Sequence, residues 1–227
     1  MPKLFSKLLY YLRLLASELI FFPFINLKYT CEKHGESGAD WWIPKNSLTR
    51  KSIVYSAGVG TNISFDVSLI NTYGLKVFAY DPTPKAVSYV EDTVHGKIPN
   101  FVFIPVGLWN SNTFQKFFVP QNTSDTSHSI VNLQKTNEFF VAQCVTLKTI
   151  MKLLKHTNLD LLKIDIEGAE FTVLKSMLND GIIPKVLCVE FDQPASLLKI
   201  INMTKIILDH NYTLVKKDFF NFTFLQK

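Results

Sequence analysis

The sequence has few cysteines, and they show no pattern typical of a disulfide framework or a metal site. Three occur in 227 residues, far apart and outside metal-ligand spacing, which favours a reducing compartment. Glycine and proline are also scarce, at 9 and 10 residues, whereas phenylalanine reaches 19. Neither an internal repeat nor a low-complexity segment is present. These absences exclude a repeat array and a linker protein.

An uninterrupted apolar run long enough to cross a membrane is also missing. The most apolar segment, residues 4–25, is accompanied by charged residues: Lys3, Lys7, Arg13 and Glu18. A spanning helix needs roughly 20 consecutive apolar residues, and no small-residue cleavage site is found, so neither a membrane span nor a secretory signal is expected. Leucines recur there at helical spacing, at Leu4, Leu8, Leu12, Leu15 and Leu19.

This leucine pattern predicts an N-terminal helix with one apolar face. The helix is expected to pack on the domain or on a partner chain, which includes self-association. The alternative is a helix on a membrane surface, helped by its basic residues. The expected location is cytoplasmic, with peripheral membrane contact left open.

Composition indicates a folded protein without a nucleic-acid partner. The hydrophobic fraction of 47% and the aromatic fraction of 13% exclude a disordered chain. The formal charge of +5 permits an anionic partner. The lysines are scattered, however, and form no run with interleaved aromatic residues, as a nucleic-acid surface would require. The length fits one α/β domain.

From residue 51 onward, strand patterns alternate with helix patterns. The expected strands cover residues 52–55, 76–80, 101–106, 113–119, 139–145, 159–164, 185–191, 212–216 and 219–225. The expected helices cover residues 62–73, 84–91, 147–155, 168–177 and 196–209. Residues 1–50 form the N-terminal helix and a lead-in, of which residues 28–48 are expected to be rich in loops. Residues 51–227 form the domain proper.

This order predicts an α/β fold with a mostly parallel seven-stranded sheet, an antiparallel C-terminal hairpin and helices on both faces. In such sheets ligands bind beyond the carboxyl ends of the strands. Chemistry is therefore expected at Ser56, Asp81, Val106, Asp165 and Glu190.

A glycine turn joins the first strand of the domain to its helix. Gly58 and Gly60 allow a tight turn and a close approach of a ligand to the backbone. The helix that starts near Asn62 offers free N–H groups and a positive dipole end. A dinucleotide fingerprint would need a small residue where Ile63 stands. The turn therefore favours a nucleoside without a pyrophosphate, and an ordinary strand-to-helix turn is the alternative.

An acidic residue closes the next strand. Asp81 follows the glycine turn by about 20 residues, the distance at which a carboxylate holds a ribose diol. An Asp-Pro pair is more often a plain turn, but the order of glycine turn, helix and Asp81 favours the ribose.

Carboxylates end two later strands as well. Asp165 and Glu167 follow one apolar strand, and Glu190 ends the next. Acidic groups at one rim can fix an ammonium group, bind a divalent cation or act as a general base. Glu170 can equally favour the first helical turn through the helix dipole, and Glu190 can equally point into solvent.

These residues resemble the FkbM family of S-adenosylmethionine-dependent methyltransferases. The similarity covers residues from about Gly35 to the C-terminus. It rests on the glycine turn over residues 54–65, on Asp81-Pro82-Thr83-Pro84, on residues 162–170 (LKIDIEGAE), on Val189-Glu190-Phe191 and on the lead-in over residues 38–44. The Asp165 motif is its most specific part.

The resemblance implies the class I, Rossmann-like methyltransferase fold and S-adenosylmethionine as the methyl donor. It also implies O-methylation of a hydroxyl on a sugar, a glycan or another natural product. The residues expected at the cofactor are Ser56, Gly58, Gly60, Asn62, Asp81, Gly107 and Asp165. Ser56 stands where many class I enzymes have an acidic residue, so Asp165 and backbone groups are expected to hold the methionine end.

Methyl transfer to a hydroxyl oxygen calls for a base or a metal ion. Asp165 and Glu190 are the candidate bases, and His128 is an alternative that can equally be a surface histidine. A divalent cation, if one binds, would lie at Asp165, Glu167 and Glu190. The acceptor is expected to bind between the lead-in and the polar segment 121–129. The competing hypothesis is a non-catalytic binding or scaffold protein that retains the fold.

Overall fold

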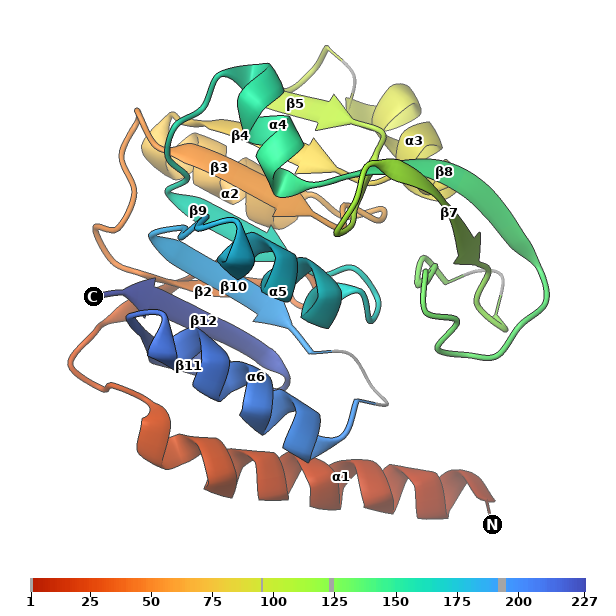
Figure 1. Cartoon of the computed structure of the whole chain (residues 1–227), viewed down its shortest axis with the longest axis vertical. Coiled ribbons are helices and arrows are strands. Elements are labelled where there is room, and N and C mark those ends of the chain that lie inside the picture. Colours follow the sequence, from red (N-terminus) through yellow and green to blue (C-terminus); the bar gives the residue numbers. More distant parts are fainter. Residues whose placement is uncertain (1, 95, 123–124, 192–194) are drawn as a thin grey trace.

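The protein is built around one twisted seven-stranded sheet (Figure 1). The computed structural model describes residues 2–94, 96–122, 125–191 and 195–227. The strands, in their order across the sheet, are β11 (Tyr212–Asp218), β12 (Asn221–Gln226), β10 (Val186–Glu190), β9 (Leu161–Ile164), β3 (Ile53–Ala57), β4 (Lys76–Tyr80) and β5 (Phe101–Ile104).

All neighbouring strands from β10 to β5 run parallel, and only β12 runs antiparallel to both of its neighbours. The antiparallel strand therefore lies between β10 and β11, and the edge belongs to β11. The predicted fold class is confirmed: the sheet is mostly parallel and carries an antiparallel C-terminal hairpin. Parallel strands direct their carboxyl ends to one edge, which fixes where a ligand site can lie.

Helices cover both faces of the sheet (Figure 1). One face carries α4 (Leu147–Leu154), α5 (Glu170–Asn179) and α6 (Leu197–Asp209). The other carries α2 (Ser64–Tyr73), α3 (Pro84–Tyr89) and the single π-helical turn η2 (Val90–Val94). Successive residues of β3 alternate between these layers, because Tyr55 packs with the first set and Val54 with the second. Hydroxyl side chains cap some of these helices: Thr83 caps α3, Thr146 caps α4 and Ser196 caps α6.

The lead-in differs from its prediction. It forms a small hairpin of β1 (Cys31–His34) and β2 (Trp41–Pro44) in place of a loop. Trp41 and Ile43 are buried with residues of α2. Two strands of four residues are too short to show a period, which is why the sequence pattern missed them.

A second small sheet stands beside the carboxyl ends of the central strands. It consists of β6 (Gly107–Leu108), β8 (Phe139–Val145) and β7 (Thr113–Phe118), in that order. The predicted strands at 113–119 and 139–145 are thus present, and they pair antiparallel with each other.

The N-terminal helix α1 (Pro2–Phe21), followed by the short 3-10 turn η1 (Phe22–Phe24), runs along the β11–β12 side of the molecule (Figure 1). Phe21 is buried, with its ring centroid 4.9 Å from that of Phe222. The helix packs on the domain, one of the two expected surfaces, but not through its leucine face, because Leu8, Leu12, Leu15 and Leu19 are all more than half exposed. Among the described residues, no helix is both long enough and apolar enough to span a bilayer.

Candidate active site

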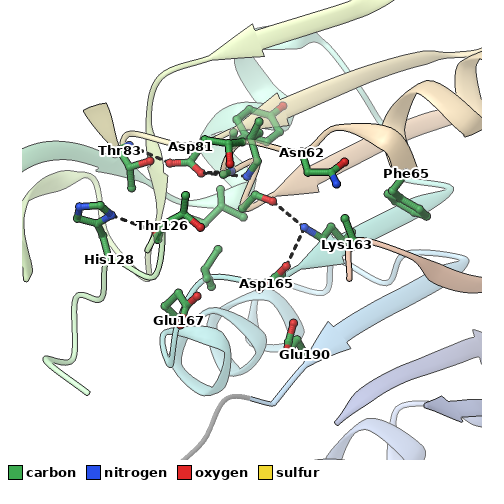
Figure 2. Close-up of a pocket in the computed structure, with 18 of the residues that line it drawn as sticks. Asn62, Phe65, Asp81, Thr83, Thr126, His128, Lys163, Asp165, Glu167 and Glu190 are labelled. Atoms are coloured by element: carbon green, nitrogen blue, oxygen red, sulfur yellow. Dashed lines mark hydrogen bonds and ion pairs between the residues drawn. The ribbon is translucent and has the colours of Figure 1, made fainter. Parts of the chain in front are cut away.

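A cavity lies beyond the carboxyl ends of β3, β4, β9 and β10, where the sheet order predicted a ligand site (Figure 2). The sequence-predicted residues that line it are Gly58, Gly60, Asn62, Asp81, Gly107, Asp165, Glu167 and Glu190. Ser56 does not line it; this side chain is wholly buried inside β3. The fold thus brings together groups that lie more than 100 residues apart in the sequence.

Gly58 is fixed by the packing of two strands. Its backbone has a φ of +88°, and a Cβ added there would lie 1.7 Å from the carbonyl oxygen of Asp165. The neighbouring backbone is tied by hydrogen bonds, since the Asp165 N–H donates to Ala57 O and the Gly58 N–H donates to Tyr80 O. The sheet itself therefore requires glycine at this position, before any cofactor is considered.

Two other predicted cofactor residues have structural duties of their own. The Asn62 side chain accepts a hydrogen bond from the Ser64 N–H at 2.9 Å and so fixes the turn that leads into α2. A Cβ on Gly107 would lie 2.8 Å from Cys144 Sγ and 2.9 Å from an atom of the Phe117 ring. Both residues line the cavity, but their presence there follows from local packing as well.

Asp81 braces the glycine turn. Its Oδ2 accepts hydrogen bonds from the Val59 and Gly60 N–H groups, both at 2.9 Å, and its Oδ1 accepts one from the Thr83 N–H at 2.8 Å. A carboxylate has about four lone-pair sites, so Asp81 retains acceptor capacity at the cavity. This carboxylate holds the shape of the turn and can also accept a hydrogen bond from a hydroxyl group of a ligand.

We expect Asp81→Asn to weaken donor binding by about tenfold or more. The backbone N–H groups donate to a carboxylate in the unmodified protein, whereas the variant would place an uncharged amide with an NH2 group against them. Isothermal titration with S-adenosylmethionine measures the effect. Asp209→Asn, an exposed change at the end of α6, is the matched control. Equal affinity in both variants would show that the brace is not needed for binding.

Lys163 is a site residue that sequence reasoning missed. Its Nζ donates to Gly58 O at 2.6 Å and lies 3.0 Å from Asp165 Oδ2 (Figure 2). Burial would lower the pKa of this ammonium, but the charges of Asp165 and Asp66 outweigh it and hold the pKa above its ordinary value. A lysine inside an apolar strand, two positions before Asp165, was the available signal.

Asp66 is the second missed residue. It lies in the first turn of α2, lines the cavity and is only 3% exposed. Burial raises the pKa of its carboxyl, against the opposing charge of Lys163. Its Oδ1 has no hydrogen-bond partner within the described part of the chain. A buried acid with an unused acceptor beside a cavity can hold a cationic ligand group.

Glu190 ends β10 and faces the cavity, so the solvent alternative does not hold. Burial raises the pKa of its carboxyl to about 8, and the charge of Asp165 on the neighbouring strand adds to this, while Lys163 opposes it. Figure 2 shows Glu190 and Asp165 together at the edge of the cavity. A carboxyl group with this pKa can accept a proton near neutral pH.

The two glutamates in the turn after β9 have different roles. Glu170 is fully buried, and its Oε1 accepts hydrogen bonds from the N–H groups of Ile166 and Gly168 at 2.9 and 3.1 Å. It stabilises the start of α5. Glu167 lines the cavity, and its carbonyl accepts a hydrogen bond from Ser129 Oγ. Across the described ranges, no group of three His, Cys, Asp or Glu side chains could hold a metal ion, so the cation hypothesis finds no support.

Further walls of the cavity come from the β1–β2 hairpin and from β7 with the segment that follows it. Asp40 and Trp41 contribute from the hairpin, and Phe117 and His128 from the other side. His128 is largely buried rather than a surface residue, and its Nδ1 lies 3.0 Å from Thr126 O. Of the expected acceptor segment, residues 123–124 lie outside the described part.

The sequence model described as "Methyltransferase FkbM domain" matches residues 53–214. The chain belongs to the FkbM methyltransferase family. The match includes the glycine turn, Asp81, Asp165 and Glu190, and it leaves out α1 and the β1–β2 hairpin. The family assignment predicted from the motifs is thereby confirmed, and with it the assignment of the FkbM domain as a methyltransferase domain.

Two solved structures are similar to this FkbM protein at low identity. An rRNA methylase from Streptococcus thermophilus has a TM-score of 0.45 and 12% identity, over 80% of this chain and 90% of that one. The fibrillarin pre-rRNA processing protein of Methanococcus jannaschii has a TM-score of 0.44 and 9% identity, over 87% and 82%. No curated protein matches the sequence significantly.

Proposed function

We propose that this FkbM protein transfers a methyl group from S-adenosylmethionine to a hydroxyl oxygen of a sugar, a glycan or another natural product. The observation that carries the proposal is the pairing of two features in one cavity. The glycine turn with Asp81 lies on one side, and Glu190 with its raised pKa lies beside Asp165 on the other.

The residues present fit the donor. Asp81 has remaining acceptor capacity for a ribose hydroxyl, and the glycine turn lets a nucleoside approach the backbone. Ile63 is buried where a dinucleotide site would need a small residue. Asp66 and Asp165 would hold the ammonium group of the methionine end, and Asp66 supplies from α2 the acid that Ser56 does not provide. When bound, the donor supplies an electrophilic methyl group on a sulfonium.

Glu190 is the better supported of the two candidate bases. Asp165 forms a salt bridge with Lys163 at 3.0 Å. Burial instead raises the pKa of the Glu190 carboxyl, which makes it the better proton acceptor. Glu190 would take the proton of the acceptor hydroxyl as its oxygen attacks. Alignment of acceptor and donor supplies a further part of the rate.

The walls favour an acceptor that carries several polar groups. The cavity lining includes the polar Asp40 and Asn221 together with the apolar Phe117 and Ile130. A few polar groups within an apolar lining orient a small molecule. A hydroxyl-rich natural product fits this lining. The residues of this wall would then determine which acceptor binds.

The test combines binding with turnover. Calorimetric titration is expected to show binding of S-adenosylmethionine, and mass spectrometry of sugar and natural-product hydroxyl acceptors is expected to show addition of one methyl group. If no donor binding occurs, the protein is a non-catalytic scaffold that retained the fold. Donor binding with unchanged turnover in both Asp165→Asn and Glu190→Gln on the true substrate would contradict the proposed chemistry and leave the donor assignment intact.

A further inference from the structure

The cavity holds many acidic side chains and very little positive charge. Among the described residues that line it, Lys163 is the only lysine or arginine, whereas the acidic ones are Asp40, Asp66, Asp81, Asp165, Glu167 and Glu190. The proposed donor carries both an ammonium group and a carboxylate at its methionine end. The acids can receive the ammonium group, but a carboxylate placed among them needs a cation or a set of N–H donors.

The backbone of the glycine turn has already used the donors that such a carboxylate would need. The Gly58 N–H donates to Tyr80 O at 3.0 Å, and the Val59 and Gly60 N–H groups both donate to Asp81 Oδ2 at 2.9 Å. Three successive N–H groups of the turn are therefore satisfied inside the protein. An anionic group of a ligand beside the turn has to find its partner among the side chains.

Lys163 is placed to be that partner. Its Nζ lies 2.6 Å from Gly58 O and 3.0 Å from Asp165 Oδ2, so it contacts both the turn and an acid of the cavity (Figure 2). An ammonium group has three N–H groups, and these contacts use two of them. Within the described ranges the third has no hydrogen-bond partner, and the nearby Trp41 ring, with its centroid 5.9 Å from Nζ, offers only an aromatic face.

The acids beside Lys163 complete a site for the two opposite charges of an amino acid. Asp66 is 3% exposed, and its Oδ1 has no hydrogen-bond partner in the described part of the chain. Asp66 and Asp165 are also the acids whose charges act most strongly on Lys163. An ammonium group and a carboxylate on one carbon atom require an acceptor and a donor close together, which this trio supplies.

The ammonium group of Lys163 keeps its charge although the residue is only 7% exposed. Burial alone would lower its pKa, but the charges of Asp165 and Asp66 hold the pKa above its ordinary value. A charge-assisted hydrogen bond is stronger than one between neutral groups, and exclusion of water strengthens it further. We propose that Lys163 binds the carboxylate of the methionine end, while Asp66 and Asp165 receive its ammonium group. The assignment rests on the proposed function, because it concerns the same donor.

The alternative is a purely structural lysine that ties β9 to β3 and compensates the charge of Asp66. Lys185, directly before β10, is an example of such a lysine, because its Nζ donates to Ser47 O at the same distance of 2.6 Å and it does not line the cavity. A short contact with a backbone carbonyl is therefore no sign of a ligand by itself. Lys163 differs from Lys185 in its place in an acidic cavity and in its remaining N–H group.

Isothermal titration with two donors separates these roles. The probes are S-adenosylmethionine and its decarboxylated form, which keeps the sulfonium and the amine but lacks the carboxylate. Lys163→Gln is expected to lower the ratio of the two association constants, full donor over decarboxylated donor, by about tenfold or more, because only the full donor loses a contact. Lys185→Gln is the matched control and should leave the ratio unchanged. Since a buried pair is screened less than distant charges, the change in the ratio should persist in about 0.5 M salt.

A structural lysine gives a different result. Equal loss of affinity for both donors in Lys163→Gln, or a change in the ratio that disappears at high salt, overturns the assignment and leaves the proposed function intact. If neither donor binds the unmodified protein, the proposed function itself fails. Circular dichroism shows whether each variant is folded. Should Lys163→Gln not fold, Lys163→Met combined with Asp66→Leu removes both buried charges as a unit and is expected to lower the same ratio, because both donors keep the amine.

Discussion

A Gly58→Ala variant is expected to lose about 3 kcal/mol or more of its free energy of unfolding. The added Cβ would lie 1.7 Å from the carbonyl oxygen of Asp165, so the β3 and β9 strand ends must separate. The φ of +88° adds backbone strain for any side chain. Urea denaturation followed by circular dichroism measures the loss, and binding of S-adenosylmethionine should fall with it.

Gly181→Ala separates the collision from the strain. Gly181 also has a positive φ, of +70°, but a Cβ there meets nothing within 4 Å. We expect that variant to lose only about 1 kcal/mol, the cost of the backbone conformation alone. Similar losses of unfolding free energy in the two variants would mean that the turn relaxes away from Asp165. Glycine would then be needed at position 58 only for its positive φ angle.

The second large effect is expected from Glu190→Gln. Removing a general base lowers turnover by about 100-fold or more, whereas the amide keeps the size of the side chain and should leave donor affinity nearly unchanged. Single-turnover kinetics measures the first quantity, and calorimetry the second. Glu91→Gln, at an exposed position, is the matched control. Full turnover in Glu190→Gln would remove Glu190 from the chemistry.

The pH dependence follows from the same carboxyl group. Its pKa is raised to about 8, so it is mostly protonated below that pH and mostly the active base above it. The kcat/KM for the donor, which reports the free enzyme, should therefore rise about tenfold for each pH unit below pH 8 and level off above it. Glu190→Gln should remove this rise. A profile that is flat from pH 6 to 9 in the unmodified protein would contradict it.

Local sequence patterns were sufficient to predict the fold class and to predict that four residues lie at one edge of the sheet. Gly58, Asp81, Asp165 and Glu190 each stand at the end of an apolar strand, and parallel strands send such ends to one edge. The pattern thus placed these residues together without any knowledge of their contacts. Through Ile63 it also favoured a nucleoside over a dinucleotide at the turn, which stays a prediction.

What the sequence could not predict depends on contacts between distant segments. Lys163 is a site residue because its side chain turns toward the Gly58 carbonyl, more than 100 positions away in the sequence. Asp66 is a site residue because α2 packs on the sheet and places this carboxyl beside Ser56 of β3 and Lys163. The direction of the leucine face of α1 could not be predicted for a similar reason, since periodicity defines a face but does not say what the face meets.

The β1–β2 hairpin has a further consequence for how such enzymes diverge. It supplies Asp40 and Trp41 to the cavity wall, yet it lies outside the segment that matches the family. The proposed donor side, by contrast, is tied to the sheet through Gly58 and Asp165. Trp41 and Ile43 anchor the hairpin in the core, so variation is expected in the turn around Asp40, and chimaeras carrying foreign turns there offer a direct route to new acceptors.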